Sequence, residues 1–259
     1  MDLGLQGRRA VVCAASSGLG LACAEALAGE GVEVTIVGRD QARLEAAARH
    51  IAGVAGARAV VKTVVADLSD PRACGELPRR TGVPDILVAN GGGPPVRHDA
   101  TGIEGELWEA AMNGLFHGPV ALIGACVGEM RARGFGRIVN ISSAAVLSPR
   151  SGFALSVSPR AALIAFCDLL AREVAPHGVT VNHLLPHSIE TQRLRENLAA
   201  EAANLGIGAD ELRARRVASI PVRRPGRPQE LGAFCAFLCG AQAGYVTGRK
   251  HVIDGGTHI

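Results

Sequence analysis

The sequence predicts a single α/β domain built on a parallel, doubly wound sheet. Short apolar runs alternate with longer amphipathic runs along the whole chain, which is typical of βαβ units with right-handed crossovers. Many of the apolar runs are β-branched, as expected for strands that are buried on both faces. The 259 residues suit one large α/β domain, and no linker divides the chain in two.

The apolar runs that we expect to be strands are short. They are 10–13, 32–37, 59–65, 85–89, 137–141, 179–185 and 251–253. Helical patterns occupy the segments 19–30, 41–52, 107–133, 160–175 and 230–238. The segment 107–133 is either one long helix or two abutting ones. A polar helical stretch, 192–216, follows the sixth strand. We therefore interpret 188–216 as a candidate substrate lid.

Composition excludes several classes of protein. Hydrophobic residues make up 48% and the net charge is only +3, so a packed core is expected and nucleic-acid binding is not. The seven cysteines are scattered and form no CxxC pair, which indicates reduced thiols in a reducing compartment. Charges interrupt the first apolar run, and no apolar run looks long enough to span a bilayer. We expect a cytoplasmic protein with no membrane contact and no metal site.

The turn after the first strand has the composition of a phosphate-binding turn. Small residues there let a pyrophosphate approach the backbone, and the helix that follows offers free N–H groups and a positive dipole end. The turn and the start of the helix contain Ala14, Ser16, Ser17, Gly18, Leu19 and Gly20. Its place between the first strand and the first helix predicts a dinucleotide site.

The ends of the second and third strands bear on the choice of coenzyme. An arginine can pair with the 2′-phosphate of NADP, whereas an acid would take the ribose hydroxyls of NAD. Arg39 precedes Asp40, so we favour NADP over NAD. Alternatively, Arg39 is a surface charge, and Asp40 caps the helix that starts at Gln41. Asp67 either meets the adenine edge or caps the turn that follows it.

Over essentially its whole length the chain resembles the short-chain dehydrogenase/reductase family. Among the branches of that family it looks most like the 3-oxoacyl-carrier-protein reductases. The motifs that carry the resemblance occur in order, and they are Ala14–Gly20, Ala66–Asp67, Ala89–Gly92, Gly136–Ser143, Val181–Asn182 with Pro186, and Asp254–Gly256. The resemblance implies a Rossmann-type sheet of about seven strands, an NAD(P) coenzyme and a homotetramer or dimer. Cofactor positions that it adds are Leu68, Asn90, Gly91, Pro186, Ile189 and Thr191.

The chain departs from the family pattern at the catalytic positions. The serine of that pattern is Ser143, whose alternative role is to initiate a turn. The tyrosine is expected thirteen residues later, where this chain has Ser156, and the lysine four beyond that, where it has Arg160. The asparagine position falls on Leu115.

Nearby residues do not restore the missing groups. Asn113 lies two residues before Leu115 and would point elsewhere on a helix. The only tyrosine, Tyr245, lies in a C-terminal segment where we expect ordinary packing. In the turn, Ala14 replaces the family's first glycine, and Cys13 replaces a threonine. Cys13 is interpreted as a small buried filler rather than a nucleophile.

The remaining groups still allow chemistry at a carbonyl. Ser156 is a poor acid, but Arg160 stays charged, so it can hold ribose hydroxyls and polarise an oxygen. His187, which follows Pro186 at the end of the sixth strand, is the candidate general acid near neutral pH. Alternatively it is a loop histidine bonded to backbone. Thr191 can likewise cap the helix from Gln192.

The other histidines are weaker candidates for a proton donor. His98 lies in the loop after the fourth strand. We expect His117 and His183 to serve packing or hydrogen bonding at the strand ends.

Three functions fit this combination. The first is an NADP-linked oxidoreductase acting on a small ketone or secondary alcohol with Ser143, Ser156, Arg160 and His187 in altered roles. The second is a dinucleotide-binding sensor, scaffold or partner subunit with weak or no hydride transfer, and the third is a lyase or isomerase. The pocket would be shaped by 91–95, 148–153 and 192–216, and the apolar helix around 161–170 can form a partner face.

Overall fold

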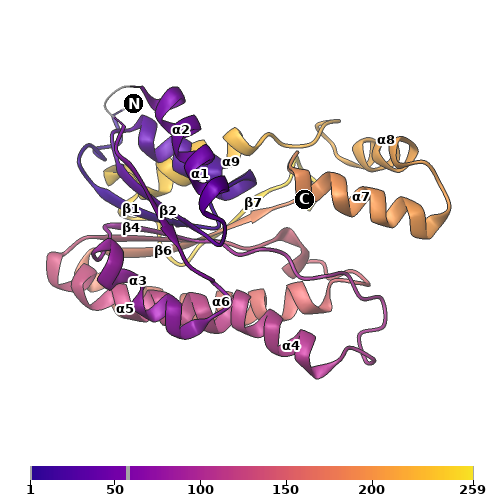
Figure 1. The fold of residues 1–259 in the computed structure, drawn as a ribbon, viewed down its shortest axis with the longest axis horizontal. Helices are drawn as coiled ribbons and strands as arrows, with labels where there is room; N and C mark the ends of the chain where they lie inside the picture. Colours follow the sequence, from indigo (N-terminus) through magenta and orange to yellow (C-terminus); the bar gives the residue numbers. More distant parts are fainter. Residues whose placement is uncertain (1, 57–58, 259) are drawn as a thin grey trace.

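Residues 2–56 and 59–258 are described by a computed structural model, in which seven strands form one parallel sheet in the order β3-β2-β1-β4-β5-β6-β7 (Figure 1). The strands are β1 (Arg9–Cys13), β2 (Glu33–Gly38), β3 (Val61–Val65), β4 (Ile86–Ala89), β5 (Gly136–Ile141), β6 (Val179–Pro186) and β7 (Lys250–Ile253). The chain order reverses between β1 and β4, which is the topological switch point of such a sheet. The predicted doubly wound, Rossmann-type fold is confirmed.

Helices cover both faces of the sheet (Figure 1). One layer contains α1 (Gly18–Gly29), α2 (Gln41–Ala55) and α9 (Pro228–Cys239). The other contains α3 (Pro71–Thr81), α4 (Gly105–Met112), α5 (Gly118–Arg133) and α6 (Ala154–Val174). Two buried apolar clusters, one under each layer, form the core. Burial on both sides explains why the five inner strands are mostly apolar, whereas the edge strands β3 and β7 are partly exposed.

Residues 105–133, between β4 and β5, form one continuous helical run with a distinct turn in the middle. A π-helical turn, η1 (Asn113–His117), joins α4 to α5. At the first residue of α5, Gly118, a Cβ atom would lie 2.5 Å from the carbonyl oxygen of Leu68. The helix therefore passes directly against the segment that follows β3.

The expectation that no apolar run is long enough to span a bilayer is wrong. The stretches Gly105–Arg133 and Ala154–His177 pass that test by length and composition. A hydrophobic stretch of this length can contain a few charged residues and still be long enough to span a bilayer. In this fold α5 packs against β5, and α6 packs against β6, as the covering helices of a doubly wound sheet do.

Two helices differ from the predicted pattern. The helix α3 has no predicted counterpart, because its segment is rich in arginine and contains Pro78. Its Asp70 N-cap accepts a hydrogen bond from the backbone N–H of Arg72 at 2.9 Å, and Pro71 occupies the first helical turn, where proline is tolerated. The second difference is that α6 begins at Ala154 rather than near residue 160.

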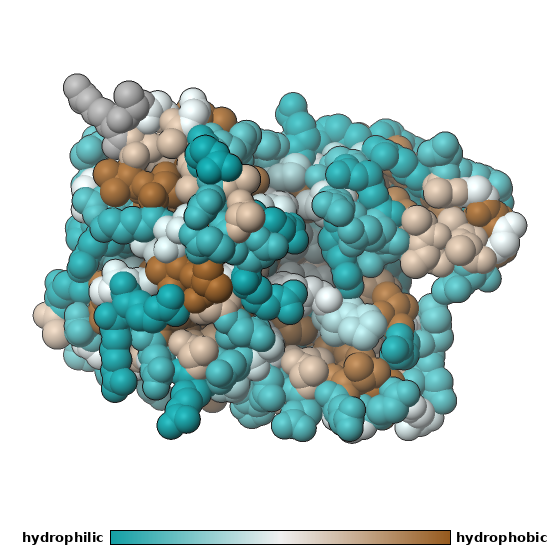
Figure 2. All heavy atoms as spheres, in the orientation of Figure 1, coloured by the Kyte–Doolittle hydropathy of each residue, from teal (hydrophilic) through white to brown (hydrophobic). Residues whose placement is uncertain are grey.

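Two helices stand apart from the sheet. They are α7 (Gln192–Leu205) and α8 (Ala209–Ser219), joined by residues 206–208, and Figure 1 places them beyond the strand ends. Gly206 ends α7 with φ of 66°, a left-handed conformation that favours glycine. Figure 2 shows the surface notched beneath this pair. The segment 188–216 therefore has the placement expected of a lid, and its role as one stays a prediction.

The prediction that Tyr245 serves ordinary packing is wrong. Its side chain is fully exposed, at 102% of the reference area. It follows a short 3₁₀ turn, η4 (Ala241–Ala243), and precedes β7 in a surface connection. An aromatic residue in a short apolar segment looks like core in the sequence, but this segment turns at the surface.

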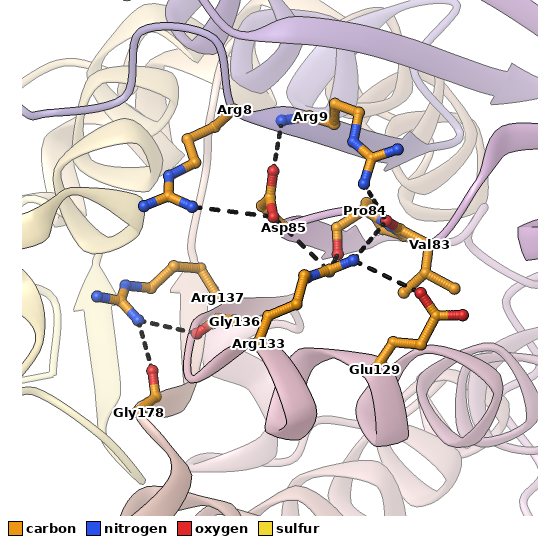
Figure 3. A network of polar contacts seen from close by, with 10 residues as sticks. All are labelled: Arg8, Arg9, Val83, Pro84, Asp85, Glu129, Arg133, Gly136, Arg137 and Gly178. Carbon is orange, nitrogen blue, oxygen red and sulfur yellow. Dashed lines mark hydrogen bonds and ion pairs between the residues drawn. The ribbon is translucent and has the colours of Figure 1, made fainter.

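A polar network fastens the amino ends of the strands (Figure 3). Asp85, which precedes β4, is 8% exposed and accepts a hydrogen bond from the backbone N–H of Arg9 at 2.9 Å. It also pairs with Arg133 at 3.7 Å and with Arg8 at 4.0 Å. The Arg8 guanidinium lies 3.8 Å from the centre of the Phe135 ring. These contacts stabilise the edge opposite the candidate site.

Candidate functional site

The turn between β1 and α1 lies at the carboxyl edge of the sheet, beside the switch point. Ala14 adopts φ of 48° and Gly18 φ of 62°. A Cβ at Gly20 would lie 2.6 Å from the carbonyl oxygen of Ala14, so the turn excludes a larger residue there. The Asn90 side-chain amide donates to the carbonyl oxygen of Cys13 at 3.3 Å. The Asn90 amide therefore ties the start of the turn to the end of β4.

The first turn of α1 has no side-chain cap within the described structure. Ser17 is the N-cap residue, yet its hydroxyl makes no capping hydrogen bond to the helix. No acidic residue lies in the first turn. The helix therefore presents uncapped backbone N–H groups and the positive end of its dipole to the carboxyl edge of the sheet, which suits a phosphate group.

Positive charge gathers where β2 ends. Asp40 Oδ1 accepts a hydrogen bond from the backbone N–H of Arg43 at 3.0 Å, which confirms that Asp40 caps α2. Arg39 is exposed. Arg43, which the sequence analysis did not single out, extends its Nη2 to the Ser17 hydroxyl at 3.3 Å. Two guanidinium groups thus lie on the side of the turn where β2 ends.

Asp67 follows β3 and caps the turn that it begins. Its Oδ1 accepts hydrogen bonds from the backbone N–H and the hydroxyl of Ser69, at 2.9 and 2.7 Å. These bonds, with a smaller contribution from the charge of Arg39, lower the pKa of Asp67. The adjacent Leu68 lines a small recess together with Cys13 and Asn90. The turn-capping role is confirmed, and contact with an adenine ring stays a prediction.

A second recess lies where β4 and β5 end. It is lined by residues that include Asn90, Gly91, Leu115, Asn140 and Arg160. A Cβ at Gly91 would lie 3.0 Å from Leu115 Cδ2, so the backbone of Gly91 approaches that side chain closely. Leu115 is buried, which makes this wall of the recess apolar.

Two serines end β5. Ser143 Oγ accepts a hydrogen bond from the backbone N–H of Ala145 at 3.2 Å, so it initiates the 3₁₀ turn η2 (Ala144–Val146). The hydroxyl still has a proton to donate. Ser142 Oγ is buried and has no hydrogen-bond partner in the part of the chain that the structure describes.

Ser156 and Arg160 contact each other on α6. Arg160 Nη1 donates to the Ser156 hydroxyl at 2.6 Å and to its carbonyl oxygen at 3.3 Å. Burial first, and the charge of Arg193 second, lower the pKa of Arg160 to about 10. The guanidinium is therefore still charged at pH 7, as the sequence predicts.

His187 has a buried ring nitrogen without a partner. Its backbone N–H donates to the carbonyl oxygen of Ile253 at 3.0 Å, but its Nδ1 has no hydrogen-bond partner among residues 2–56 and 59–258. The ring meets that of His258 edge-on, with centroids 5.4 Å apart.

Burial first, then the charges of Arg150 and His258, lower the pKa of His187 to about 4. The ring is therefore neutral near pH 7. That differs from the general acid titrating near neutrality that the sequence suggests. The alternative interpretation is a loop histidine bonded to backbone. The backbone N–H of His187 makes such a bond, but among the described residues its ring nitrogen Nδ1 makes none.

The segment after β6 lies against the start of α1. Pro186 ends the strand, and Ile189 is buried and bridges to Gly226. Thr191 Oγ1 accepts from the backbone N–H of Leu194 at 3.2 Å, which confirms that it caps α7. A Cβ at Gly18 would lie 3.7 Å from the Thr191 methyl group, so the cap of α7 borders the start of α1.

Comparison with known proteins identifies the family. A family model described as enoyl-(acyl carrier protein) reductase matches residues 13–258. The 3-oxoacyl-[acyl-carrier-protein] reductase FabG of Aquifex aeolicus is 31% identical over 99% of this chain and 99% of its own. Human dehydrogenase/reductase SDR family member 4 is 30% identical over 98% of this chain and 88% of its own. The chain belongs to the short-chain dehydrogenase/reductase family.

Solved structures agree. The crystal structure of L-sorbose reductase from Gluconobacter frateurii, complexed with NADPH and L-sorbose, superposes with a TM-score of 0.91. It is 31% identical and covers 99% of this chain and 98% of its own.

In this short-chain dehydrogenase/reductase, some predicted site residues come together and others do not. Ser156 and Arg160 touch, and Arg160 shares a recess with Asn90, Gly91 and the asparagine position Leu115. Asn113 begins the π-helical turn and does not line that recess. His187 is not among the residues that line this recess. The charged groups that shift the pKa of its ring are Arg150, His258, Asp254 and Arg216.

The sequence analysis missed an arginine that joins α7 to the loop after β4 in this short-chain dehydrogenase/reductase. Arg193, in the first turn of α7, donates from Nη2 to the carbonyl oxygen of Pro94 at 2.7 Å. A Cβ at Gly93 would lie 3.1 Å from the same guanidinium. The two segments are 99 residues apart in the chain, so no local pattern signals the contact.

The remaining candidates are structural. Burial raises the pKa of the Cys13 thiol to about 12, which fits a filler and not a nucleophile. His183 is fully buried, with Asn140 at its Nδ1 and Asp168 at its Nε2, as expected for hydrogen bonding on a strand. Among the described residues, no group of three or more His, Cys, Asp or Glu side chains is arranged so that it could hold a metal ion.

The two other histidines are peripheral. His117 packs its ring edge-on to Phe116 with centroids 5.1 Å apart, which agrees with the predicted packing role. His98 is exposed and lies beside Gly152.

Proposed function

We propose that this short-chain dehydrogenase/reductase is an NADP(H)-dependent oxidoreductase that interconverts a small ketone and a secondary alcohol. The observation that carries the proposal is the uncapped start of α1 at the same sheet edge as Ser143 and Arg160. The residues present fit a dinucleotide, because the turn has no room for a Cβ at Gly20 and keeps its N–H groups free.

The coenzyme would lie across the switch point. Its phosphates would bind the turn and the start of α1, and its nicotinamide ring would lie near the ends of β5 and β6. The residues that we assign to it are Ala14, Ser16, Ser17, Gly18, Leu19, Gly20, Arg39, Asp67, Leu68, Asn90, Gly91, Arg160, Pro186, Ile189 and Thr191. We add Arg43, which already contacts the Ser17 hydroxyl.

NADP is favoured over NAD because of the charge at the end of β2. Arg39 and Arg43 present two guanidinium groups there, and the nearby Asp40 is engaged as a helix cap. A guanidinium recognises a phosphate by paired hydrogen bonds. L-sorbose reductase, which superposes closely, was crystallised with NADPH.

Three side chains would act on the substrate, and a fourth, Ser156, would position one of them. When bound, the coenzyme supplies the hydride that reaches the carbonyl carbon. Ser143 donates its hydroxyl proton in a hydrogen bond to the carbonyl oxygen, on which negative charge develops. Arg160 stabilises that charge and holds the ribose, while Ser156 fixes the guanidinium by accepting its hydrogen bond.

A proton must then reach the oxygen, and we assign its delivery to His187. Its buried Nδ1 lacks a partner in the described structure. With a pKa near 4 in the free protein, it becomes an effective acid only when substrate raises that pKa.

The apolar wall of the recess favours one alternative. With Leu115 at the asparagine position and a serine at the tyrosine position, the usual chain of proton-transferring groups is absent. A dinucleotide-binding sensor, scaffold or partner subunit with little hydride transfer would need none of them. Tight NADPH binding without turnover on a broad panel of ketones and alcohols would favour this alternative.

We further propose a cytoplasmic homodimer or homotetramer with one catalytic domain, residues 1–259, and a lid at 188–216. The outer side of α6 is apolar and exposed at Ala161, Ala165 and Leu169, the last at 66%. Such a face suits a second copy of the chain. Sedimentation velocity tests the assembly.

NADPH titration followed by thermal unfolding tests the proposed function directly. A ligand that binds only the folded state raises the melting temperature, and at a given concentration a tighter ligand raises it more. We expect saturable protection by NADPH, weaker protection by NADH, and NADPH oxidation with at least one ketone. Absence of protection by either coenzyme would reject the proposal.

A further inference from the structure

The residues that follow β7 lie beside His187. The strands β6 and β7 are paired and end at the same edge of the sheet (Figure 1). The backbone N–H of His187 donates to the carbonyl oxygen of Ile253, the last residue of β7, at 3.0 Å. The ring of His258 meets the ring of His187 edge-on, with centroids 5.4 Å apart. A second histidine therefore lies against the one to which we assign proton delivery.

Asp254 fixes the His258 ring. Its Oδ2 accepts hydrogen bonds from the Nδ1 of His258 at 2.8 Å and from the backbone N–H of the same residue at 2.7 Å. A carboxylate only accepts hydrogen bonds, so the Nδ1 of His258 carries a hydrogen, and in the neutral ring the lone pair lies on Nε2. The side chains of Asp254 and His258 are 9% and 18% exposed, so the pair is largely buried but still reaches water.

The turn that carries this pair is held in place from the other side. A Cβ at Gly255 would lie 2.6 Å from a methyl group of Val222 and 2.8 Å from one of Ile220, so the turn packs tightly on the segment that follows α8. The backbone N–H of Val222 also donates to the carbonyl oxygen of Gly255 at 3.2 Å. Gly255 has φ of 63°, a conformation that favours glycine. The position of His258 beside His187 is therefore fixed by packing on both sides.

His187 needs a proton source, and one of its neighbours can provide it. Its buried Nδ1 has no hydrogen-bond partner in the part of the chain that the structure describes. The charged groups that act on the ring are Arg150 after β5, Arg216 on α8, and the pair Asp254 and His258 after β7. An arginine keeps its proton and an aspartate has none to give near pH 7, so His258 is the one that can exchange a proton there.

We propose that His258, oriented by Asp254, supplies the proton that His187 delivers to the substrate, so that the three side chains form a proton-transfer chain from the protein surface to the substrate. The inference rests on the proposed function, because it adds the proton source for the same reaction. His258 and Asp254 are positioning residues in this chain, since they act through His187 and do not touch the substrate.

One proton crosses the chain in each reduction. As the substrate oxygen gains negative charge, an N–H bond of protonated His187 breaks and the O–H bond of the alcohol forms. His187 obtains that proton when an N–H bond of protonated His258 breaks. The two rings meet edge-on, so the proton passes between their nitrogens through a bridging water molecule. His258 then takes a new proton from solvent, and the Asp254 carboxylate stabilises the imidazolium that results.

The first measurement tests the pairing and needs no turnover. Long-range ¹H–¹⁵N spectra of the histidine rings are recorded on the full-length protein saturated with NADPH, while the pH is lowered from 8 to 5. We expect His258 to show the Nδ1–H tautomer, and the ring signals of His187 to shift as His258 takes up its proton. That response should be lost in His258→Gln. It should persist in His251→Gln, the matched control, whose ring on β7 packs against Phe234 instead.

The second measurement tests the proton transfer with the ketone that the wild type reduces fastest. His258→Gln should lower kcat roughly 10- to 100-fold, part of the usual contribution of acid catalysis, and leave KM and the affinity for NADPH unchanged. Imidazole added to the buffer should restore part of that kcat, which repair of a merely structural defect would not do.

Asp254→Asn removes the charge that stabilises protonated His258, so the fall of kcat with rising pH should begin at a lower pH than in the wild type. His251→Gln should keep both kcat and its pH profile.

Three results would overturn the inference or its basis. A His187 signal that does not respond to His258, or a kcat in His258→Gln that equals the wild-type value, would overturn the proton-transfer chain while the proposed function stands. A lowered kcat that imidazole does not raise, with the pH profile of Asp254→Asn unchanged, would assign His258 a structural role instead. Absence of ketone reduction by the wild type would reject the proposed function and this inference with it.

Discussion

Arg160 Nη1 and Ser156 Oγ lie 2.6 Å apart, one helical turn from each other on α6. The guanidinium is thereby held against residue 156, where the family pattern has a tyrosine. Residues four apart on a helix face the same side, so the pair can be replaced as a unit.

Replacing both residues should restore ordinary acid catalysis. In Ser156→Tyr with Arg160→Lys, the phenol gains a proton-transferring role beside an ammonium group that can stabilise its anion. We expect kcat for ketone reduction to rise by roughly 10²-fold, within the usual range for general acid catalysis. Steady-state NADPH oxidation checks this.

The control for that experiment replaces Ser156 by phenylalanine in the same Arg160→Lys background. It supplies the ring without the hydroxyl. Equal kcat values in the tyrosine and phenylalanine variants would contradict a proton-transfer role at position 156.

Ala14 carries backbone strain that a glycine would relieve. Its φ of 48° lies in the left-handed region, which is unfavourable for a residue with a Cβ. Ala14→Gly should therefore raise the free energy of unfolding by about 1 kcal/mol, measured by urea denaturation. The neighbouring Ala15→Gly is the matched control, because Ala15 is buried and has no positive φ. That control should destabilise the protein, and a loss of stability in Ala14→Gly as well would refute the strain argument.

The strands could be predicted to within about two residues because burial on both faces makes the inner strands apolar, and the edge strands β3 and β7 keep short β-branched runs. Helix boundaries were harder to predict, because apolarity alone does not locate them. The start of α6 was missed because Pro159 lies inside the helix, and a proline there usually indicates a boundary. The long stretch 192–216 was predicted as helical, but its division at Gly206 depends on a left-handed residue that composition alone does not locate.

The contacts of the candidate site likewise fall into two groups, those that local spacing predicts and those that it does not. Asp40 as a cap and Arg160 four residues after Ser156 follow from spacing, because a helix fixes which residues are neighbours. Contacts between distant segments, such as Arg193 with Pro94 or His187 with His258, depend on how loops cross the sheet edge. The low pKa of His187 arises from those contacts, so it could not be predicted from the sequence.

The charges at the end of β2 should decide coenzyme preference. Arg39→Gln and Arg43→Gln each remove a guanidinium that we assign to the 2′-phosphate, and a charge-assisted hydrogen bond of this kind contributes about 1.5–3 kcal/mol. Affinity for NADPH should fall roughly 10- to 100-fold while affinity for NADH changes little. Fluorescence titration of both coenzymes measures the ratio. Arg49→Gln removes an exposed arginine further along α2 and should leave that ratio as it is in the wild type, and a parallel fall for both coenzymes in Arg39→Gln would exclude the assigned role.

Stability should fall in mild acid because of His183. Burial, partly opposed by Asp168, lowers the pKa of this fully buried ring from 6.5 to about 4. Between those values the unfolded chain binds a proton that the folded chain does not, so stability is full above pH 6.5 and declines as the pH falls toward 4. From pH 7.5 to 5.5 the contribution of one such histidine is about 1.4 kcal/mol.

Urea denaturation at the two pH values, in wild type and in His183→Gln, isolates that contribution. Glutamine has no proton to gain in this range, although it will change stability at both pH values by removing contacts with Asn140 and Asp168. The comparison therefore uses the difference between pH 7.5 and pH 5.5 within each protein. That difference should be smaller by about 1.4 kcal/mol in the variant, and an equal difference in both proteins would mean that the buried ring already takes up its proton above pH 5.5.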